Sequence, residues 1–161
     1  MVSRFGKFCA STAVLLTVVC VQGFSPARAD DAPAYTPSGK GTRLLESGGV
    51  VIRMLVEEAN LGGREVELGE ITFPVEYGHG PEHTHGRLEV IYVLSGVLGH
   101  TVNGALHRLE PGMVGIVRPG DTVAHAVLSE QPVRALLVWA PGGEAQALID
   151  SFGFEERPLP E

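Results

Sequence analysis

The sequence predicts an all-β domain, an antiparallel jelly-roll barrel followed by one short C-terminal helix. Short apolar runs rich in valine, isoleucine and leucine recur through residues 50–139, and turn signals separate them, a spacing typical of barrels and sandwiches. Glycine and proline contribute 21 and 11 of the 161 residues without a Gly-X-Y period, which favours many turns over long helices. Hydrophobic residues make up 44% of the chain, enough for a packed core.

The turn signals divide the barrel into about eight strands. The expected strands are 50–56, 65–73, 90–94, 97–102, 105–108, 113–117, 124–129 and 133–139. Asn103-Gly104 separates two of them. This dipeptide favours a two-residue hairpin because both positions of the turn take positive φ.

The first 29 residues have the pattern of a bacterial secretory signal. Arg4 and Lys7 precede a mostly apolar run at 8–24, and Ala27-x-Ala29 fits a small-residue cleavage site. The run is shorter than the roughly 20 apolar residues that a membrane-spanning helix needs. We therefore expect cleavage after Ala29 and a periplasmic or secreted mature protein with no membrane attachment.

Three segments follow the predicted signal peptide. Residues 30–46 are polar with Pro and Gly and are expected to form a flexible lead-in. The barrel is expected at 47–140. A short helix at 144–150 and a loose tail complete the chain within 141–161.

Charge and cysteine usage exclude several classes of function. The net charge is −7, and an acidic domain without a basic cluster is a poor partner for nucleic acid. Cys9 and Cys20 both lie in the predicted signal. The mature domain would therefore have no disulfide, no thiolate metal site and no cysteine nucleophile.

Four side chains with metal-ligand chemistry occur at informative spacings. The pattern is His83-x-His85-x3-Glu89, followed by His125. Alternate residues of a strand share a face, so the first three have the same parity. Nitrogen and oxygen donors without thiolate suit Fe, Mn, Ni, Cu or Zn. We expect one divalent transition metal held by three histidines and one carboxylate; the alternatives are a site that loads no metal and a surface histidine loop.

These residues also carry a resemblance to the cupin superfamily. Gly78-x4-His83-x-His85-x3-Glu89-x6-Gly96 resembles the first cupin motif, and Gly112-x6-Pro119-Gly120-x4-His125 resembles the second. Ser129 stands where the second motif usually ends with Asn. The resemblance implies a small single-domain cupin of the type-2 group, a barrel that holds one metal and commonly forms homodimers.

Two residues are candidates for a catalytic role. Glu89 is expected either to ligate the metal or, as the resemblance to some cupins implies, to act as an acid or base. His100 shares its parity with Leu98 and Val102. It is therefore expected to face the interior, as a hydrogen-bond partner, a proton shuttle or a structural core histidine.

Other polar and aromatic residues have expected positions. Arg87 is expected to pair with Glu82 at the surface, with contact to an anionic substrate as the alternative. Tyr92 has the parity opposite to Glu89 and should point outward, where a dimer interface could cover it. Trp139 is expected to pack in the core or an interface, and Ser129 could reach the cavity.

The resemblance implies three candidate functions. The first is a metal-dependent dioxygenase similar to quercetin or β-diketone dioxygenases, acting on a small, largely apolar substrate that bears oxygen. The second is a lyase or isomerase on the same site. The third is a non-catalytic periplasmic protein that binds metal or a small ligand. The substrate-binding residues are not identified by the sequence, and the metal and reaction are left open because one fold hosts many chemistries.

Overall fold

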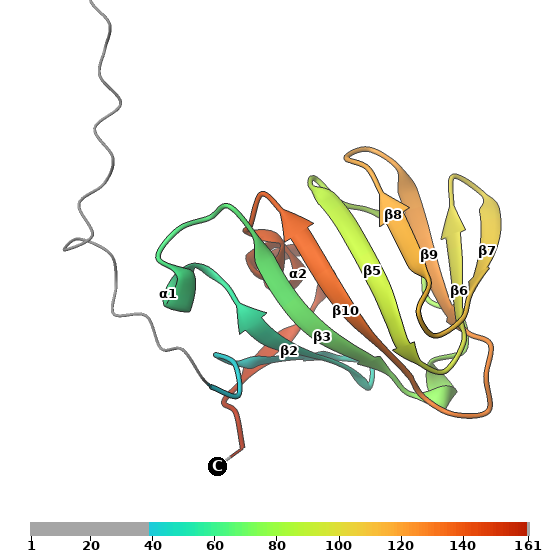
Figure 1. Ribbon diagram of the computed structural model, residues 1–161, viewed down its shortest axis with the longest axis horizontal. Coiled ribbons are helices and arrows are strands. Elements are labelled where there is room, and N and C mark those ends of the chain that lie inside the picture. The colour runs from blue at the N-terminus through green and yellow to red at the C-terminus, as the bar shows by residue number, and fades with distance from the viewer. Residues whose placement is uncertain (1–38, 161) are drawn as a thin grey trace, which may run out of the picture.

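The protein folds into two antiparallel sheets that form a jelly-roll barrel (Figure 1). The computed structural model describes residues 39–160; the expected signal peptide and residues 30–38 lie outside them. The strands are β1 (Leu44–Ser47), β2 (Val50–Val56), β3 (Glu67–Phe73), β4 (His83–Thr84), β5 (Leu88–Ser95), β6 (Leu98–Val102), β7 (Ala105–Leu109), β8 (Val114–Val117), β9 (Thr122–Val127), β10 (Val133–Ala140) and β11 (Glu155–Arg157).

The strand order places the segments that contain the predicted ligands on both sheets. The larger sheet has the order β11-β1-β2-β3-β10-β5-β8, and the smaller has the order β4-β9-β6-β7. The helical segments among the described residues are α1 (Glu58–Leu61), the 3-10 turn η2 (Val75–Tyr77) and α2 (Glu144–Phe152). In Figure 1, α2 lies behind β3 and β10.

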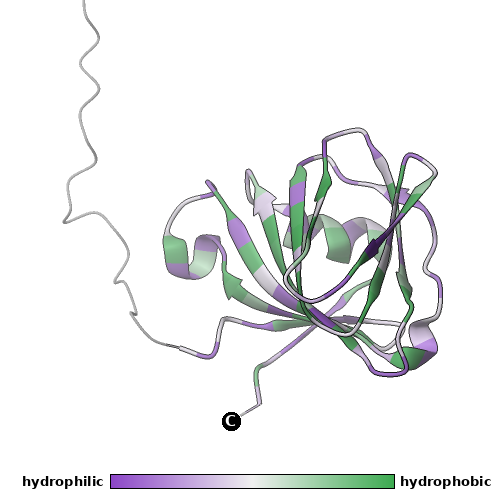
Figure 2. Cartoon of the chain, turned by 45° about the vertical axis from the view of Figure 1, so that its right-hand side comes forward, coloured by the Kyte–Doolittle hydropathy of each residue, from purple (hydrophilic) through white to green (hydrophobic). Residues whose placement is uncertain are grey.

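Alternation along the strands separates core from surface. On β5, Ile91 and Val93 are buried, whereas Tyr92 and Leu94 are exposed, which confirms the outward position expected for Tyr92. Figure 2 shows the same alternation of apolar and polar residues along the strands. Trp139 is 1% exposed and lies in the core, the first of the two positions expected for it.

The predicted hairpin is present between β6 and β7. Asn103 has φ 49° and Gly104 has φ 79°, so both turn residues adopt the positive φ that their sequence favours. The two strands then pair from Val102↔Ala105 to Leu98↔Leu109. This short-range signal fixes the register that brings His100 opposite His107 on β7. The separate pairing of β6 with β9 places His100 opposite His125.

Several elements differ from the sequence-based expectations. Strand β1 begins at Leu44, inside the segment expected to be a flexible lead-in, and β11 includes Arg157 of the expected loose tail. Leu45 is fully buried and pairs with Ile52 and Glu156. A pair of adjacent leucines, Leu44 and Leu45, gives no periodic signal, so this pairing of distant segments could not be predicted from the sequence.

The helices of the described residues are short. None of them is both long enough and apolar enough to cross a bilayer. The longest is α2, at 9 residues.

Candidate metal centre

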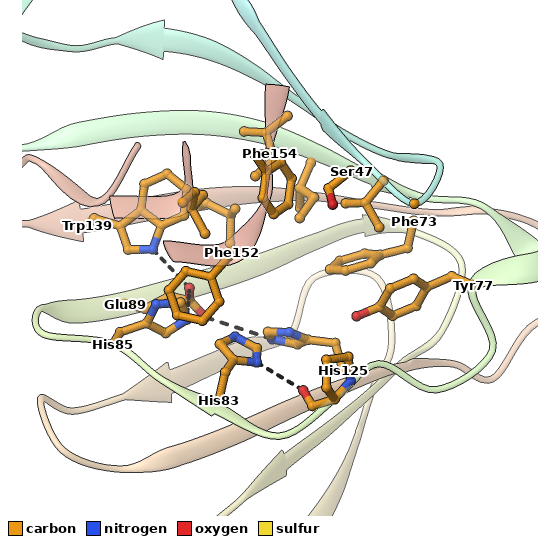
Figure 3. Close-up of a pocket in the computed structure, with 17 residues that line it drawn as sticks. Ser47, Phe73, Tyr77, His83, His85, Glu89, His125, Trp139, Phe152 and Phe154 are labelled. Carbon is orange, nitrogen blue, oxygen red and sulfur yellow. Dashed lines mark hydrogen bonds and ion pairs between the residues drawn. The ribbon is translucent and has the colours of Figure 1, made fainter. Parts of the chain in front are cut away.

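A pocket of about 280 Å³ opens between the sheets and leads to the histidine cluster (Figure 3). Its walls are mainly apolar and aromatic. The aromatic side chains that line it are Phe73, Tyr77, Trp139, Phe152 and Phe154. Among the described residues, the lining contains no lysine or arginine. The pocket therefore suits an uncharged, largely apolar molecule.

Three of the predicted ligands come from the smaller sheet or the loop beside it. His83 lies on β4 opposite Val123 of β9, and His85 follows one residue after β4. His125 is on β9 and alternates inward with Val123, because side chains two residues apart share a face. The pairing of β4 with β9 thus brings the His83-x-His85 motif beside His125.

Glu89 comes from the opposite sheet. It is buried on β5 and shares the inward face with Ile91 and Val93. The expectation that His83, His85 and Glu89 share a face through the alternation of a single strand was therefore wrong. The chain leaves β4 after Thr84 and enters β5 at Leu88, so the segment between them crosses from one sheet to the other.

The four predicted ligands converge at the inner end of the pocket (Figure 3). His85 Nε2 lies 3.2 Å from Glu89 Oε2, and His125 Nε2 lies 3.8 Å from Glu89 Oε1. The ring centre of His83 lies 4.8 Å from that of His85 and 5.8 Å from that of His125. All four side chains line the same pocket.

In three of the predicted ligands, one polar atom of the side chain contacts a residue outside the cluster of four. His83 Nδ1 lies 3.1 Å from the carbonyl oxygen of Pro81, and His85 Nδ1 lies 2.8 Å from Glu144 Oε1. The indole N–H of Trp139 donates to Glu89 Oε2 at 2.9 Å. Such outer partners orient metal ligands and set the tautomer of a ligating histidine.

Three buried donor atoms of the predicted ligands lack hydrogen-bond partners. His85 Nε2, His125 Nε2 and Glu89 Oε1 are buried and make no hydrogen bond, which is unusual for buried polar atoms and calls for an explanation such as a bound ion. Within residues 39–160, however, no three His, Cys, Asp or Glu side chains have donor atoms close enough to form a metal-binding group as they stand. The residues fit a divalent metal by the type of their donor atoms, and their ligand roles stay predictions.

Burial dominates the electrostatics of the cluster. It lowers the pKa of His125 well below its usual value, and the neighbouring histidines lower that pKa further. Burial also lowers the pKa of His83 and raises that of Glu89. For His85, burial lowers the pKa, but the hydrogen bond to Glu144 and the charge of Glu89 outweigh it, so the net pKa is raised. The lowered pKa values of His83 and His125 favour neutral imidazoles, which can donate a lone pair to a metal.

His100 lies in the interior as expected, but behind the pocket. It is 2% exposed, and neither ring nitrogen has a hydrogen-bond partner. Its ring packs against that of His125, with the ring centres 5.3 Å apart and the planes tilted by 31°. Burial and the charge of His107 lower the pKa of His100 to about 4. His100 does not line the pocket, so any effect on a ligand passes through His125.

Two sequence-based expectations are corrected here. Arg87 does not pair with Glu82; its guanidinium donates to Glu144 Oε2 at 3.1 Å and to the carbonyl oxygen of Gly142 at 3.0 Å. Ser129 does not reach the cavity. Its hydroxyl accepts from the Val97 N–H at 3.0 Å and donates to a carbonyl oxygen within its own turn.

The sequence analysis missed Glu144 and the aromatic residues of the C-terminal segment. Glu144 is 1% exposed and bonds both His85 and Arg87. Phe152 lies against the cluster, with its ring centre 5.7 Å from that of His83. A glutamate at the start of a short helix is an ordinary surface signal, so only the fold reveals that this one is buried.

Comparison with known proteins identifies the class. Residues 61–139 match the sequence profile of the cupin domain family. The fold is similar to an RmlC-like cupin from Shewanella frigidimarina, with 21% identity, a TM-score of 0.58 and coverage of 71% of this chain and 97% of that one. With this match and the barrel described above, residues 61–139 form a cupin domain.

Two other solved structures share the fold. A predicted oxalate decarboxylase from Thermotoga maritima is 19% identical, with a TM-score of 0.55 and coverage of 63% of this chain and 94% of that one. The DMSP lyase DddQ from Ruegeria pomeroyi is 22% identical, with a TM-score of 0.50 and coverage of 56% and 46%. The sequence has no significant match among curated proteins. At these identities the likeness establishes the fold but not the reaction, which must be argued from the site.

Proposed function

We propose that this cupin is an exported, mononuclear metal-dependent enzyme of the dioxygenase type, acting on a small, largely apolar substrate that bears oxygen. The observation that carries the proposal is the set of buried donor atoms without hydrogen bonds, at the inner end of an aromatic pocket. His83, His85, Glu89 and His125 would hold the metal. When bound, a divalent transition metal supplies Lewis-acid activation of the substrate and redox chemistry with dioxygen.

The pocket walls support the choice of substrate class. An anionic molecule would lose its hydration there without meeting a lysine or arginine among the lining residues. The aromatic side chains instead offer stacking and edge contacts to a flat ring. A volume of about 280 Å³ restricts the ligand to a small molecule. A neutral aromatic enol or phenol meets all three requirements.

Glu89 is the residue best placed to handle a proton. Trp139 holds Oε2, which leaves Oε1 without a hydrogen bond and facing His125. Oε1 is therefore the atom that would ligate the metal or accept a proton from the substrate. His100, whose ring packs against that of His125, would hold that ring in place or relay a proton.

The same carboxylate supports a second candidate, a lyase or isomerase. A buried base with one oxygen held by Trp139 and the other free can abstract a proton next to a carbonyl without dioxygen. Equal turnover in air and under anaerobic conditions would favour this second function over the first.

Metal content and oxygen uptake test the proposal together. The purified protein is loaded separately with Fe²⁺, Mn²⁺, Ni²⁺, Cu²⁺ and Zn²⁺, beside His83→Ala, His125→Ala and the control His107→Ala, an exposed histidine on β7. We expect about one metal per chain in wild type and control, loss of metal in the other two variants, and oxygen uptake with a flavonol. Metal binding without turnover of any enol would indicate a binding protein, and no binding at all would overturn the metal centre.

Export is tested separately. The proposal rests on Arg4, Lys7, the apolar run and Ala27-x-Ala29. We expect the protein recovered from the periplasm of a bacterial host to begin at Asp30 when its N-terminus is sequenced. An intact N-terminus in the cytoplasmic fraction would contradict export.

A further inference from the structure

Glu144 ties the C-terminal helix to the histidine cluster. It is the first residue of α2, and its side chain is almost completely buried. Its two carboxylate oxygens contact two different residues of the loop that joins β4 and β5. Oε1 lies 2.8 Å from His85 Nδ1, and Oε2 accepts from Arg87 Nη1 at 3.1 Å.

The contact with Glu144 selects one tautomer of His85. An ionised carboxylate only accepts hydrogen bonds, so the proton of a neutral His85 ring must sit on Nδ1. The lone pair then sits on Nε2, which is the atom that lies 3.2 Å from Glu89 Oε2 and has no hydrogen bond. We propose that Glu144 is a positioning residue that fixes the tautomer and ring orientation of His85, and so presents Nε2 to the metal.

The start of α2 is built to hold this carboxylate in place. Gly143 has φ 107°, a conformation that favours glycine, and a Cβ there would lie 2.7 Å from Arg87 Nη2, so a side chain would displace the guanidinium from the turn. The Ala145 N–H donates to the buried Glu67 Oε2 at 2.9 Å. A carboxylate in the first turn of a helix is also favoured by the helix dipole.

The same segment covers the pocket. Leu148, Phe152 and Phe154 line it, and the ring centre of Phe152 lies 6.5 Å from that of His85. Figure 3 shows Phe152 beside His83, His85 and Glu89. These residues follow the part of the chain that matches the family profile, residues 61–139. The helix therefore completes the site at two places, through Glu144 at its start and through the aromatic residues at its end.

Two measurements test the role of Glu144, and only the second rests on the proposed metal centre. The first is ¹⁵N NMR of the metal-free full protein labelled on histidine at pH 8.5, with His85 assigned by comparison with His85→Gln. We expect wild-type His85 to be protonated on Nδ1. Glu144→Gln, which keeps the side-chain volume, and Glu144→Ala should shift this signature, whereas Gln146→Ala on the exposed face of the same helix should not.

The second measurement is the affinity for Co²⁺. We expect Glu144→Gln and Glu144→Ala to weaken binding about 10- to 100-fold, the usual effect of removing an outer partner of a ligating histidine, with Gln146→Ala unchanged. Wild-type His85 protonated on Nε2, or Glu144 variants that keep the wild-type signature and bind Co²⁺ within twofold of wild type, would overturn the proposal. If wild type binds no Co²⁺ but Glu144→Gln shifts the His85 signature, the positioning role stands and the metal centre fails. The wild-type spectrum decides the tautomer even if every Glu144 variant fails to fold.

Discussion

Trp139 donates its indole N–H to Glu89 Oε2 across a distance of 2.9 Å, and both side chains are buried. The two residues face each other in the register of β10 and β5. The bond joins an inward-pointing aromatic side chain to the carboxylate beside it on the same sheet. The sheet register therefore sets the orientation of the candidate ligand.

Replacing Trp139 with Phe should destabilise the protein. The variant removes the donor and leaves a buried carboxylate oxygen without a partner, which costs about 1–3 kcal/mol. Urea denaturation followed by circular dichroism measures the free energy of unfolding. In a Glu89→Leu background the same change should cost less, because no acceptor remains. Equal costs in the two backgrounds would show that packing, and not the hydrogen bond, accounts for the loss.

Gly115→Ala should disturb the contact between the His100 and His125 rings. Gly115 is buried on β8, and a Cβ there would lie 2.7 Å from His100 Nε2 and 2.9 Å from Ile91 Cγ2. Because the core has no room for the shift, we expect a loss of about 1–3 kcal/mol in the free energy of unfolding. Gly39→Ala, which meets nothing within 4 Å, serves as the control. If Gly115→Ala left the free energy of unfolding unchanged, the His100 ring would be free to move.

The sequence predicts those parts of the site that depend on local pattern. Alternation on β5 places Glu89 inward and Tyr92 outward, and the Asn103-Gly104 turn sets the register of His100, all as found. These features could be predicted because each depends on the backbone geometry of neighbouring residues.

Contacts between distant segments could not be predicted in this way. Glu144 and His85 are 59 positions apart, and nothing in the sequence around either one indicates the other. Glu82, an acid close to Arg87 in the sequence, is the simplest partner to expect for Arg87. In the structure Arg87 instead pairs with Glu144, because the buried charge of Glu144 requires both Arg87 and His85 as partners. Tertiary packing therefore decides which charges pair.

The outer face of β5 and β8 should bind a second copy of the chain. Tyr92, Leu94, Val114 and Ile116 are exposed there, Tyr92 pairs with Val114, and β8 ends the larger sheet. These side chains carry no charge, in a chain with a net charge of −7. Two equally acidic copies can therefore approach through this face with the least repulsion.

Light scattering tests the dimer directly. We expect a wild-type dimer at micromolar concentrations and a monomer for Ile116→Glu. Leu106→Glu, at an equally exposed position on β7 in the other sheet, should stay dimeric. A monomeric wild-type protein, or dissociation by both variants alike, would argue against this face.

Asp121 should make a pH-dependent contribution to stability. Hydrogen bonds from Asn103 Nδ2 at 2.8 Å and from the Arg118 N–H at 2.9 Å lower the pKa of Asp121. Because this pKa is lower in the folded state, the carboxylate stabilises the fold above about pH 4, and the effect is lost as the pH falls through the folded pKa. Asp121→Asn should lower the Tm at pH 7, and the difference from wild type should shrink toward pH 3. A difference that stays constant with pH would exclude the charge as its source.

Phe152→Ala should weaken the binding of a neutral aromatic ligand with little effect on stability. The Phe152 ring is 37% exposed at the pocket and lies against His83, so its loss should change the free energy of unfolding by about 1 kcal/mol or less. One aromatic contact is worth about 0.5–1.5 kcal/mol, so the Kd for 2-naphthol, measured by its own fluorescence, should rise roughly three- to tenfold. Leu61→Ala, an exposed change on α1, should leave this Kd unchanged. Tighter binding by Phe152→Ala would show that the ring blocks the pocket instead of contacting the ligand.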